Sequence, residues 1–168
     1  MRVSFLLTLF FLLTLPLQSQ EKVPEGNGGE AKGKEAPHTP HGPPDISGTW
    51  VGELLQNEGG IADRFEFSME ITQVGLAIKG TTYVRLEEIY AEMDFSGYVL
   101  PNGSWKILER GVVRSQKPLE LSWCMKRFLL TMTYTREGMM LTGPWWGDSA
   151  FGPCIPGSVR LRKRIKRA

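Results

Sequence analysis

From Asp45 onward, the chain alternates apolar and polar residues with a period of two, in short runs separated by turn-forming residues. Residues 63–73 show the pattern most clearly, with apolar side chains at every second position: Phe65, Phe67, Met69 and Ile71. Such alternation is typical of antiparallel strands that bury one face. Helical periodicity is weak throughout, and only Leu86–Met93 is ambiguous. The pattern therefore predicts an all-β domain.

Eight strands are expected from these runs. Their ranges are Ser47–Gln56, Asp63–Gln73, Leu76–Arg85, Ile89–Val99, Trp105–Val113, then either Leu119–Trp123 or Phe128–Thr135, Met139–Trp145 and Ser158–Arg164. Turn residues such as Asn57-Glu58-Gly59-Gly60 and Pro101-Asn102-Gly103 join them, and Gly80 in mid-strand indicates a bend or bulge. Successive strands with short connections favour an eight-stranded antiparallel up-and-down β-barrel, because closure removes exposed sheet edges. A β-sandwich is the alternative.

Residues 1–44 are expected to precede the folded domain. Residues 1–19 have the form of a signal peptide, with Arg2, an apolar run that Pro16 ends, and the small residue Ser19. No cysteine lies near Ser19, so a lipoprotein anchor is not expected, and no stretch is long enough for a membrane-spanning helix. Residues 20–44, rich in Lys, Glu, Gly and Pro, are predicted to be a disordered linker. The β-barrel domain would then comprise residues 45–168 of a secreted or periplasmic protein.

The chain has two cysteines, Cys124 and Cys154, both inside the predicted domain. An even number of cysteines in an exported protein favours a disulfide. This bridge would join the middle of the chain to the segment before the last strand and so stabilise closure of the barrel.

Gly48-Thr49-Trp50, on the first strand of an eight-stranded secreted chain, resembles the lipocalin and avidin group of calycin barrels. In lipocalins a Gly-x-Trp begins the first strand, and an arginine of the last strand packs over that Trp near the closed end. The resemblance implies a structural role for Trp50, with Arg160 or Arg162 as its cover. This chain departs from lipocalins because Gly147–Pro156 is a Gly/Pro-rich loop where they have a helix.

Several chemistries are not expected. The predicted domain contains no histidine, since His38 and His41 lie in the linker, and this argues against Ser-His-Asp or Cys-His catalysis and most zinc sites. Glu92 and Asp94 would suit a carboxylate-based hydrolase only if they faced inward, but alternation places them outside. We expect no enzymatic activity, no cofactor and no metal.

Charge argues against nucleic acid as a partner. The formal net charge is +2, although Arg160–Ala168 carries six basic residues and no acid. No aromatic residue is interleaved with these basic residues, so we interpret them as the solvated face of the last strand. The sequence does not define the oligomeric state.

The function favoured by the sequence is non-enzymatic binding of a small apolar or amphipathic ligand inside the barrel. Of the adjacent pair Trp145-Trp146, one ring is expected to point inward and one to the rim. The candidate ligand-binding residues are Trp145, Trp146, Phe67, Met69, Met93, Phe95 and Met132. The alternative is a protein-interaction module, such as an inhibitor-type barrel or an envelope-associated adaptor. Exposed tryptophans around a concave mouth would favour the first function, and a flat aromatic patch the second.

Overall fold

The computed structural model describes residues 42–165. The predicted signal peptide and the first 22 residues of the predicted linker, including His38 and His41, lie outside this range. Within it there are nine strands and no helix. They are β1 (Gly48–Gln56), β2 (Arg64–Val74), β3 (Ala77–Leu86), β4 (Ile89–Val99), β5 (Trp105–Gln116), β6 (Met125–Thr135), β7 (Gly138–Ser149), β8 (Gly152–Pro153) and β9 (Gly157–Lys163).

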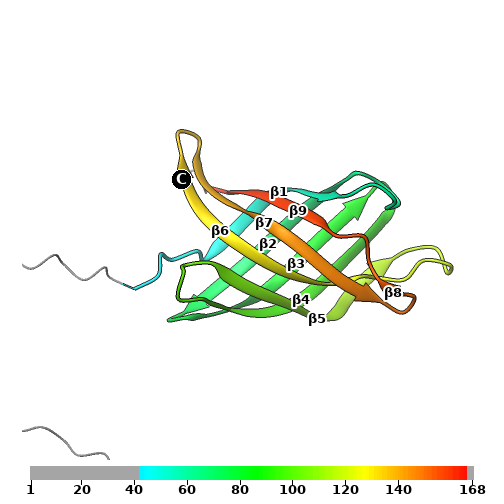
Figure 1. The fold of residues 1–168 in the computed structure, drawn as a ribbon, viewed down its shortest axis with the longest axis horizontal. Coiled ribbons are helices and arrows are strands. Elements are labelled where there is room, and N and C mark those ends of the chain that lie inside the picture. Colours follow the sequence, from blue (N-terminus) through cyan, green and yellow to red (C-terminus); the bar gives the residue numbers. More distant parts are fainter. Residues whose placement is uncertain (1–41, 166–168) are drawn as a thin grey trace, which may run out of the picture. The chain divides into compact units, whose positions relative to one another are not determined.

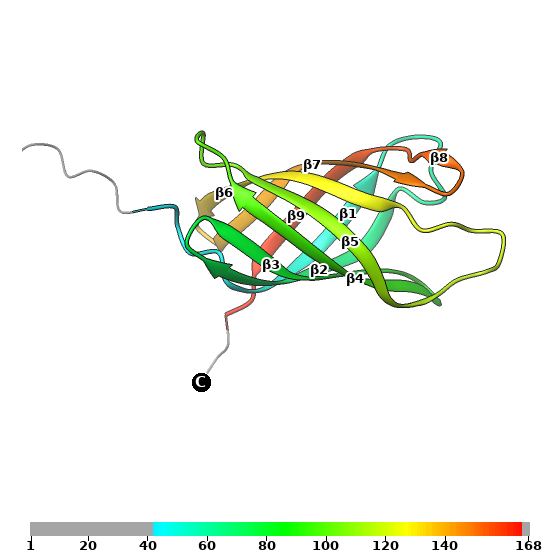
Figure 2. The same cartoon turned by 90° about the horizontal axis from the view of Figure 1, so that it is seen from below.

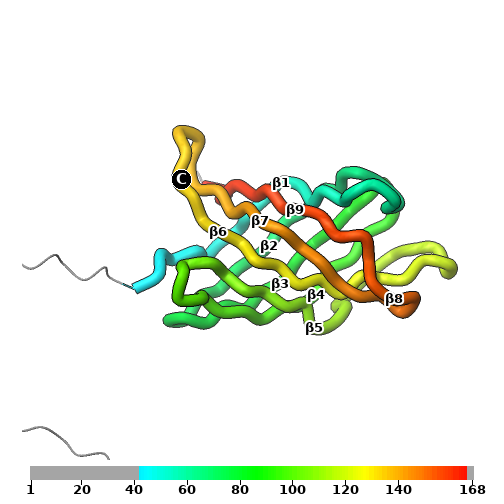
Figure 3. The backbone as a smooth tube through the Cα atoms, viewed as in Figure 1, coloured from blue at the N-terminus to red at the C-terminus, as the bar shows by residue number. Residues whose placement is uncertain are grey.

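The strands form one closed antiparallel barrel (Figure 1). Neighbours pair in chain order from β1 to β7, and β9 lies between β7 and β1 (Figure 3). The two-residue strand β8 pairs only with β7. The predicted eight-stranded up-and-down barrel is confirmed, and the β-sandwich is excluded because a single sheet closes on itself.

The structure decides the open choice for the sixth strand in favour of Phe128–Thr135, and it corrects two other local predictions. The sixth strand is Met125–Thr135, so Leu119–Trp123 is part of a loop. The β7 strand continues to Ser149, four residues beyond its predicted end, because the Gly/Pro-rich segment pairs with β6 and β8. The register stays continuous through Gly80, and the irregularities lie instead in β5.

Alternation directs one face of each strand into the core. On β2, for example, Phe67, Met69 and Ile71 are buried, while Glu66 and Glu70 are exposed. The core also holds three fully buried indole rings, those of Trp50, Trp105 and Trp145. Aromatic side chains bury large areas, so these rings fill much of the interior of a small barrel.

The segment before β1 closes one end of the barrel. Ile46 is fully buried, and its carbonyl accepts a hydrogen bond from the indole Nε1 of Trp50 at 2.8 Å. Gln73 holds this segment in place, because its Oε1 accepts from the backbone N–H of Ile46 at 2.9 Å. We call this end, where Ile46 and Trp50 lie, the closed end.

Candidate functional site

A cavity of about 230 Å³ lies at the end of the barrel opposite Trp50. Its walls come from the C-terminal ends of β1 and β3, the β1–β2 loop, residues 117–126 and the segment around β8. Figures 1 and 2 show the β5–β6 connection and the β8 hairpin projecting from this same end. The lining residues are Leu54, Gln56, Gly59, Gly60, Ile61, Phe65, Val84, Arg85, Leu86, Ile89, Lys117, Leu121, Ser122, Trp123, Cys124, Lys126, Trp145, Ser149, Cys154 and Ile155.

The inner wall of the cavity is apolar and well ordered by packing. Leu54, Val84 and Trp145 line it and are buried. The indole Nε1 of Trp145 donates to the carbonyl of Leu55 at 2.8 Å, which orients the ring. Gly157 makes room for this arrangement, since a Cβ at this position would lie 2.9 Å from the same Nε1. Such a wall suits an apolar group.

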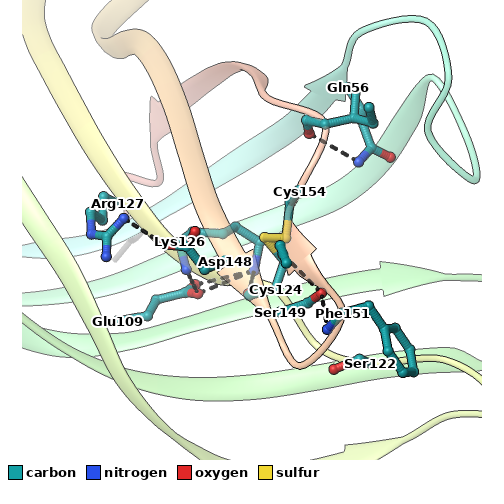
Figure 4. The surroundings of a disulfide bond; sticks show 12 residues. Gln56, Glu109, Ser122, Cys124, Lys126, Arg127, Asp148, Ser149, Phe151 and Cys154 are labelled. Atoms are coloured by element: carbon teal, nitrogen blue, oxygen red, sulfur yellow. Dashed lines mark hydrogen bonds and ion pairs between the residues drawn. A yellow bond between two sulfur atoms is a disulfide. The ribbon is translucent and has the colours of Figure 1, made fainter.

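The predicted disulfide forms part of the cavity wall. Cys124, just before β6, is bonded to Cys154, just after β8 (Figure 4). The backbone N–H of Cys154 donates to the carbonyl of Gly147 at 2.9 Å, and that of Ala150 donates to Ser122 Oγ at 3.1 Å. The bridge therefore joins the long β5–β6 loop to the β7–β9 connection across the mouth of the barrel.

A buried ion pair lies at the polar side of the cavity. Lys126 Nζ is 3.2 Å from Glu109 Oε2, and their side chains are 5% and 0% exposed. Lys126 Nζ also donates to the carbonyl of Cys124 at 3.2 Å, and Thr82 Oγ1 donates to Glu109 Oε1 at 2.7 Å. Both charges are thus paired and hydrogen-bonded, as burial requires.

The Glu109 side chain also takes the place of a missing backbone hydrogen bond between β5 and β6. The β5 and β6 strands pair only over Trp105–Leu108 and Arg127–Leu130, and then diverge toward the cavity. At the point of divergence, Glu109 Oε2 accepts a hydrogen bond from the backbone N–H of Lys126 at 2.7 Å. The carboxylate therefore satisfies a donor that the β5 backbone no longer reaches.

Sequence reasoning did not identify the Glu109–Lys126 pair, although a signal was present. Glu109 follows Trp105 and Ile107 on the inward face of β5, and Lys126 precedes Phe128 and Leu130 on the inward face of β6. A charged residue on the inward face of a strand, two positions from buried apolar residues, indicates a buried partner of opposite charge. The alternation alone does not show which partner it meets.

Two side chains that line the cavity carry buried polar atoms without a hydrogen-bond partner in the described part of the chain. These atoms are Gln56 Oε1 and Trp123 Nε1. The amide nitrogen of Gln56 donates to the carbonyl of Ile155 at 3.1 Å (Figure 4). A third such atom, Trp105 Nε1, lies in the core and not at the cavity. Because unsatisfied buried groups are uncommon in native proteins, the two at the cavity support its choice as the candidate binding site.

The predicted ligand-binding residues occupy different places. Trp145 lines the cavity, whereas Trp146 points outward and is 38% exposed. Four others are buried in the packed core and do not line the cavity: Phe67, Met69, Met93 and Phe95. Met132 is partly buried against the core beyond the cavity, where it pairs with Leu141. The structure thus brings only Trp145 of this set to the cavity.

At the closed end, the cation over the Trp50 ring is Lys163, not Arg160 or Arg162. Lys163 Nζ lies 5.6 Å from the ring centroid. Val159, Leu161 and Lys163 share the inward phase of β9, so the two arginines between them point outward. Arg160 lies near Glu53 and Arg162 pairs with Glu137. Strand alternation therefore corrects the predicted arginine cover.

The carboxylates considered for hydrolysis lie on the outer wall. Glu92 accepts from Arg114 Nε at 2.6 Å, and Asp94 is exposed. Ala91, Met93 and Phe95 fill the inward positions of the same strand. Neither carboxylate lines the cavity.

Comparison of the chain with protein-family models, with curated proteins and with solved structures finds no match. The closed eight-stranded antiparallel barrel is consistent with a calycin-like fold. Within residues 42–165, no helix has the length and apolar character needed to cross a bilayer.

Proposed function

We propose that this protein binds a small apolar or amphipathic ligand in the cavity opposite Trp50, without catalysing a reaction. The observation that carries the proposal is the 230 Å³ cavity with its apolar wall of Leu54, Val84 and Trp145. Small-molecule sites are concave and mostly apolar, with a few polar groups that orient the ligand. A lipocalin-like or avidin-like relationship, which the Gly48-Thr49-Trp50 motif suggests, agrees with this function.

The distribution of tryptophans favours ligand binding over a protein-interaction module. Trp123 and Trp145 line the concave end of the barrel. Trp146, at 38%, is the most exposed indole among the described residues, and it lies on the outer wall. The described residues therefore present no flat patch of several tryptophans for a protein partner.

Titration with N-phenylnaphthylamine, an uncharged apolar fluorophore, tests the proposal. We expect saturable binding to the full chain. Val84→Phe, which fills the cavity, should weaken binding about tenfold, because overpacking a confined site costs roughly 1–3 kcal/mol. Val51→Phe makes the same change on the outer wall, where Val51 is 38% exposed, and should leave binding unchanged. Absent binding, or equal effects of the two variants, would refute a cavity site.

We also propose that the protein is exported, as a secreted or periplasmic domain. The Cys124–Cys154 disulfide supports this, because such bonds persist in oxidising compartments. The sequence of residues 1–19 supports it independently. Intact-mass measurement of the exported chain should show cleavage near Ser19 and the loss of two hydrogens at the cysteines. A full-length chain with two free thiols would contradict the proposal.

A further inference from the structure

The charged groups that line the cavity all have the same sign. They are Arg85, Lys117 and Lys126, and no Asp or Glu is among the lining residues. Most ion pairs of the described residues lie on the outer wall of the barrel, as do Arg64–Glu53 and Arg127–Asp148. The side chains that line the cavity therefore carry positive charge only.

The three cations are not equivalent. The charge of Lys126 is neutralised by Glu109 inside the barrel. Arg85 and Lys117 lie at the rim, nearer solvent. Arg85 follows the inward-facing Val84 on β3, so it starts from the outer face, opposite Glu66 in the register, and reaches the lining at the strand end. Within residues 42–165 neither cation has a carboxylate at ion-pair distance. Their printed partners are backbone carbonyls: Arg85 Nε donates to Glu87 O at 2.9 Å, and Lys117 Nζ to Pro118 O at 3.4 Å. Both retain N–H groups for a ligand.

The unpaired polar atoms are consistent with a ligand that accepts hydrogen bonds. Trp123 Nε1 is a donor and lacks an acceptor among the described residues. Among the buried side-chain atoms of the described residues, Gln56 Oε1 is the one unpaired acceptor, and it is packed against Gly60, where a Cβ would lie 2.2 Å away. Together with the N–H groups that Arg85 and Lys117 retain, these side chains offer a ligand more donors than acceptors.

We propose that the ligand is an organic anion with an apolar body. Its body would contact Leu54, Val84 and Trp145, and its anionic head would lie at the mouth, between Arg85 and Lys117. Charge-assisted hydrogen bonds from guanidinium and ammonium groups are stronger than neutral ones and favour carboxylate, sulfonate or phosphate heads. This inference rests on the proposed function, because it specifies the ligand of the same cavity.

A matched pair of fluorophores tests the inference. Anilinonaphthalene sulfonate and N-phenylnaphthylamine share an aromatic body and differ by the sulfonate. The sulfonate should bind the wild-type chain about tenfold more tightly, since two partly exposed ion pairs contribute roughly 0.5–1 kcal/mol each. Its affinity should fall as NaCl is added, whereas that of the uncharged probe should not.

Substitutions then locate the effect. Arg85→Met with Lys117→Met should bring the two affinities to within about twofold. Lys79→Met with Lys106→Met removes the same total charge from residues outside the cavity lining and should preserve the preference. Thermal unfolding of both double variants verifies that they are folded, and the salt titration of the wild type tests the inference without any substitution.

The outcomes separate this inference from the proposed function. If the uncharged probe binds as tightly as the sulfonate, or if the two double variants behave alike, the anion inference is overturned while the cavity remains a binding site. If neither probe binds the wild-type chain, the proposed function fails and the anion inference fails with it.

Discussion

Lys126 donates to Glu109 from its backbone N–H, at 2.7 Å, and from its ammonium, which lies 3.2 and 3.4 Å from the two carboxylate oxygens. The backbone bond continues the β5–β6 ladder with a side chain, and the ammonium bonds compensate the charge of a lysine side chain that is 5% exposed. The same carboxylate therefore joins the two strands and permits a lysine to line the cavity.

Separate and combined substitutions should reveal this coupling. Lys126→Met leaves the Glu109 carboxylate without its cation, and Glu109→Gln leaves the ammonium without its anion. Each should lower the free energy of unfolding by roughly 3–5 kcal/mol, because an unpaired buried charge is costly. The double variant should lose much less than the sum, since Gln still accepts the backbone N–H. Urea denaturation of the four proteins measures the coupling, and additive losses would contradict it.

Trp50 is expected to be structural. Trp50→Ala should reduce the free energy of unfolding by roughly 3–5 kcal/mol, through lost apolar burial and the cavity left behind. Trp146→Ala is the matched control, because Trp146 is 38% exposed on the outer wall and should cost much less. Chemical denaturation gives both values. A Trp50→Ala protein with wild-type stability but impaired probe binding would assign Trp50 to the ligand site instead.

The disulfide should stabilise the barrel through its 30-residue loop. Cys124→Ser with Cys154→Ser should lower the free energy of unfolding by about 3.6 kcal/mol, the chain-entropy expectation for a loop of this size. Reduction of the wild type should reproduce the loss, and reductant should not affect the double variant. If the denaturation midpoint of the wild type is the same with and without reductant, the bridge adds no stability.

Asp45 should contribute to acid sensitivity. The Ser47 hydroxyl and then the Ser47 backbone N–H donate to its carboxylate, at 2.6 and 2.8 Å, and hold its pKa below the usual 3.8. The folded state therefore favours the ionised form, so this contribution is present above pH 3.8 and is lost as pH falls through the lower folded pKa.

Replacement of Asp45 by Asn should make unfolding stability less dependent on pH between about pH 5 and pH 2. The effect should be small, because solvent screens the exposed carboxylate. Urea denaturation at several pH values compares the two proteins. If the unfolding free energies of the wild type and the variant change with pH in parallel, Asp45 does not contribute to acid sensitivity.

Local patterns predicted most of the strands, because the side-chain period of a strand is visible in a few consecutive residues. Ile89–Val99 was predicted with both its boundaries, and Phe67, Met69 and Ile71 were placed on the buried face. Predicted strand ends were wrong where hydrogen bonding to a neighbouring strand extends a segment whose Gly and Pro content is typical of a loop. The Gly/Pro-rich end of β7 remains a strand because Gly147 and Asp148 pair with β6.

The candidate site was predicted less well, since a cavity depends on side chains from several strands. The sequence identified Trp145 and the disulfide, but it placed Phe67, Met69, Met93 and Phe95 at the site when they fill the core. It also missed Glu109 and Lys126, which are 17 residues apart.

By itself, the sequence determined the all-β class, the number of long strands and the buried face of strands such as β2 and β4, because these follow from alternation along the chain. The up-and-down topology also implied that the last strand meets the first, but only the tertiary structure decided that Lys163, not Arg160 or Arg162, covers Trp50. It also decided that β5 and β6 separate at the mouth, where Glu109 meets Lys126. These features depend on which distant strands become neighbours and in what register, and no local pattern records this.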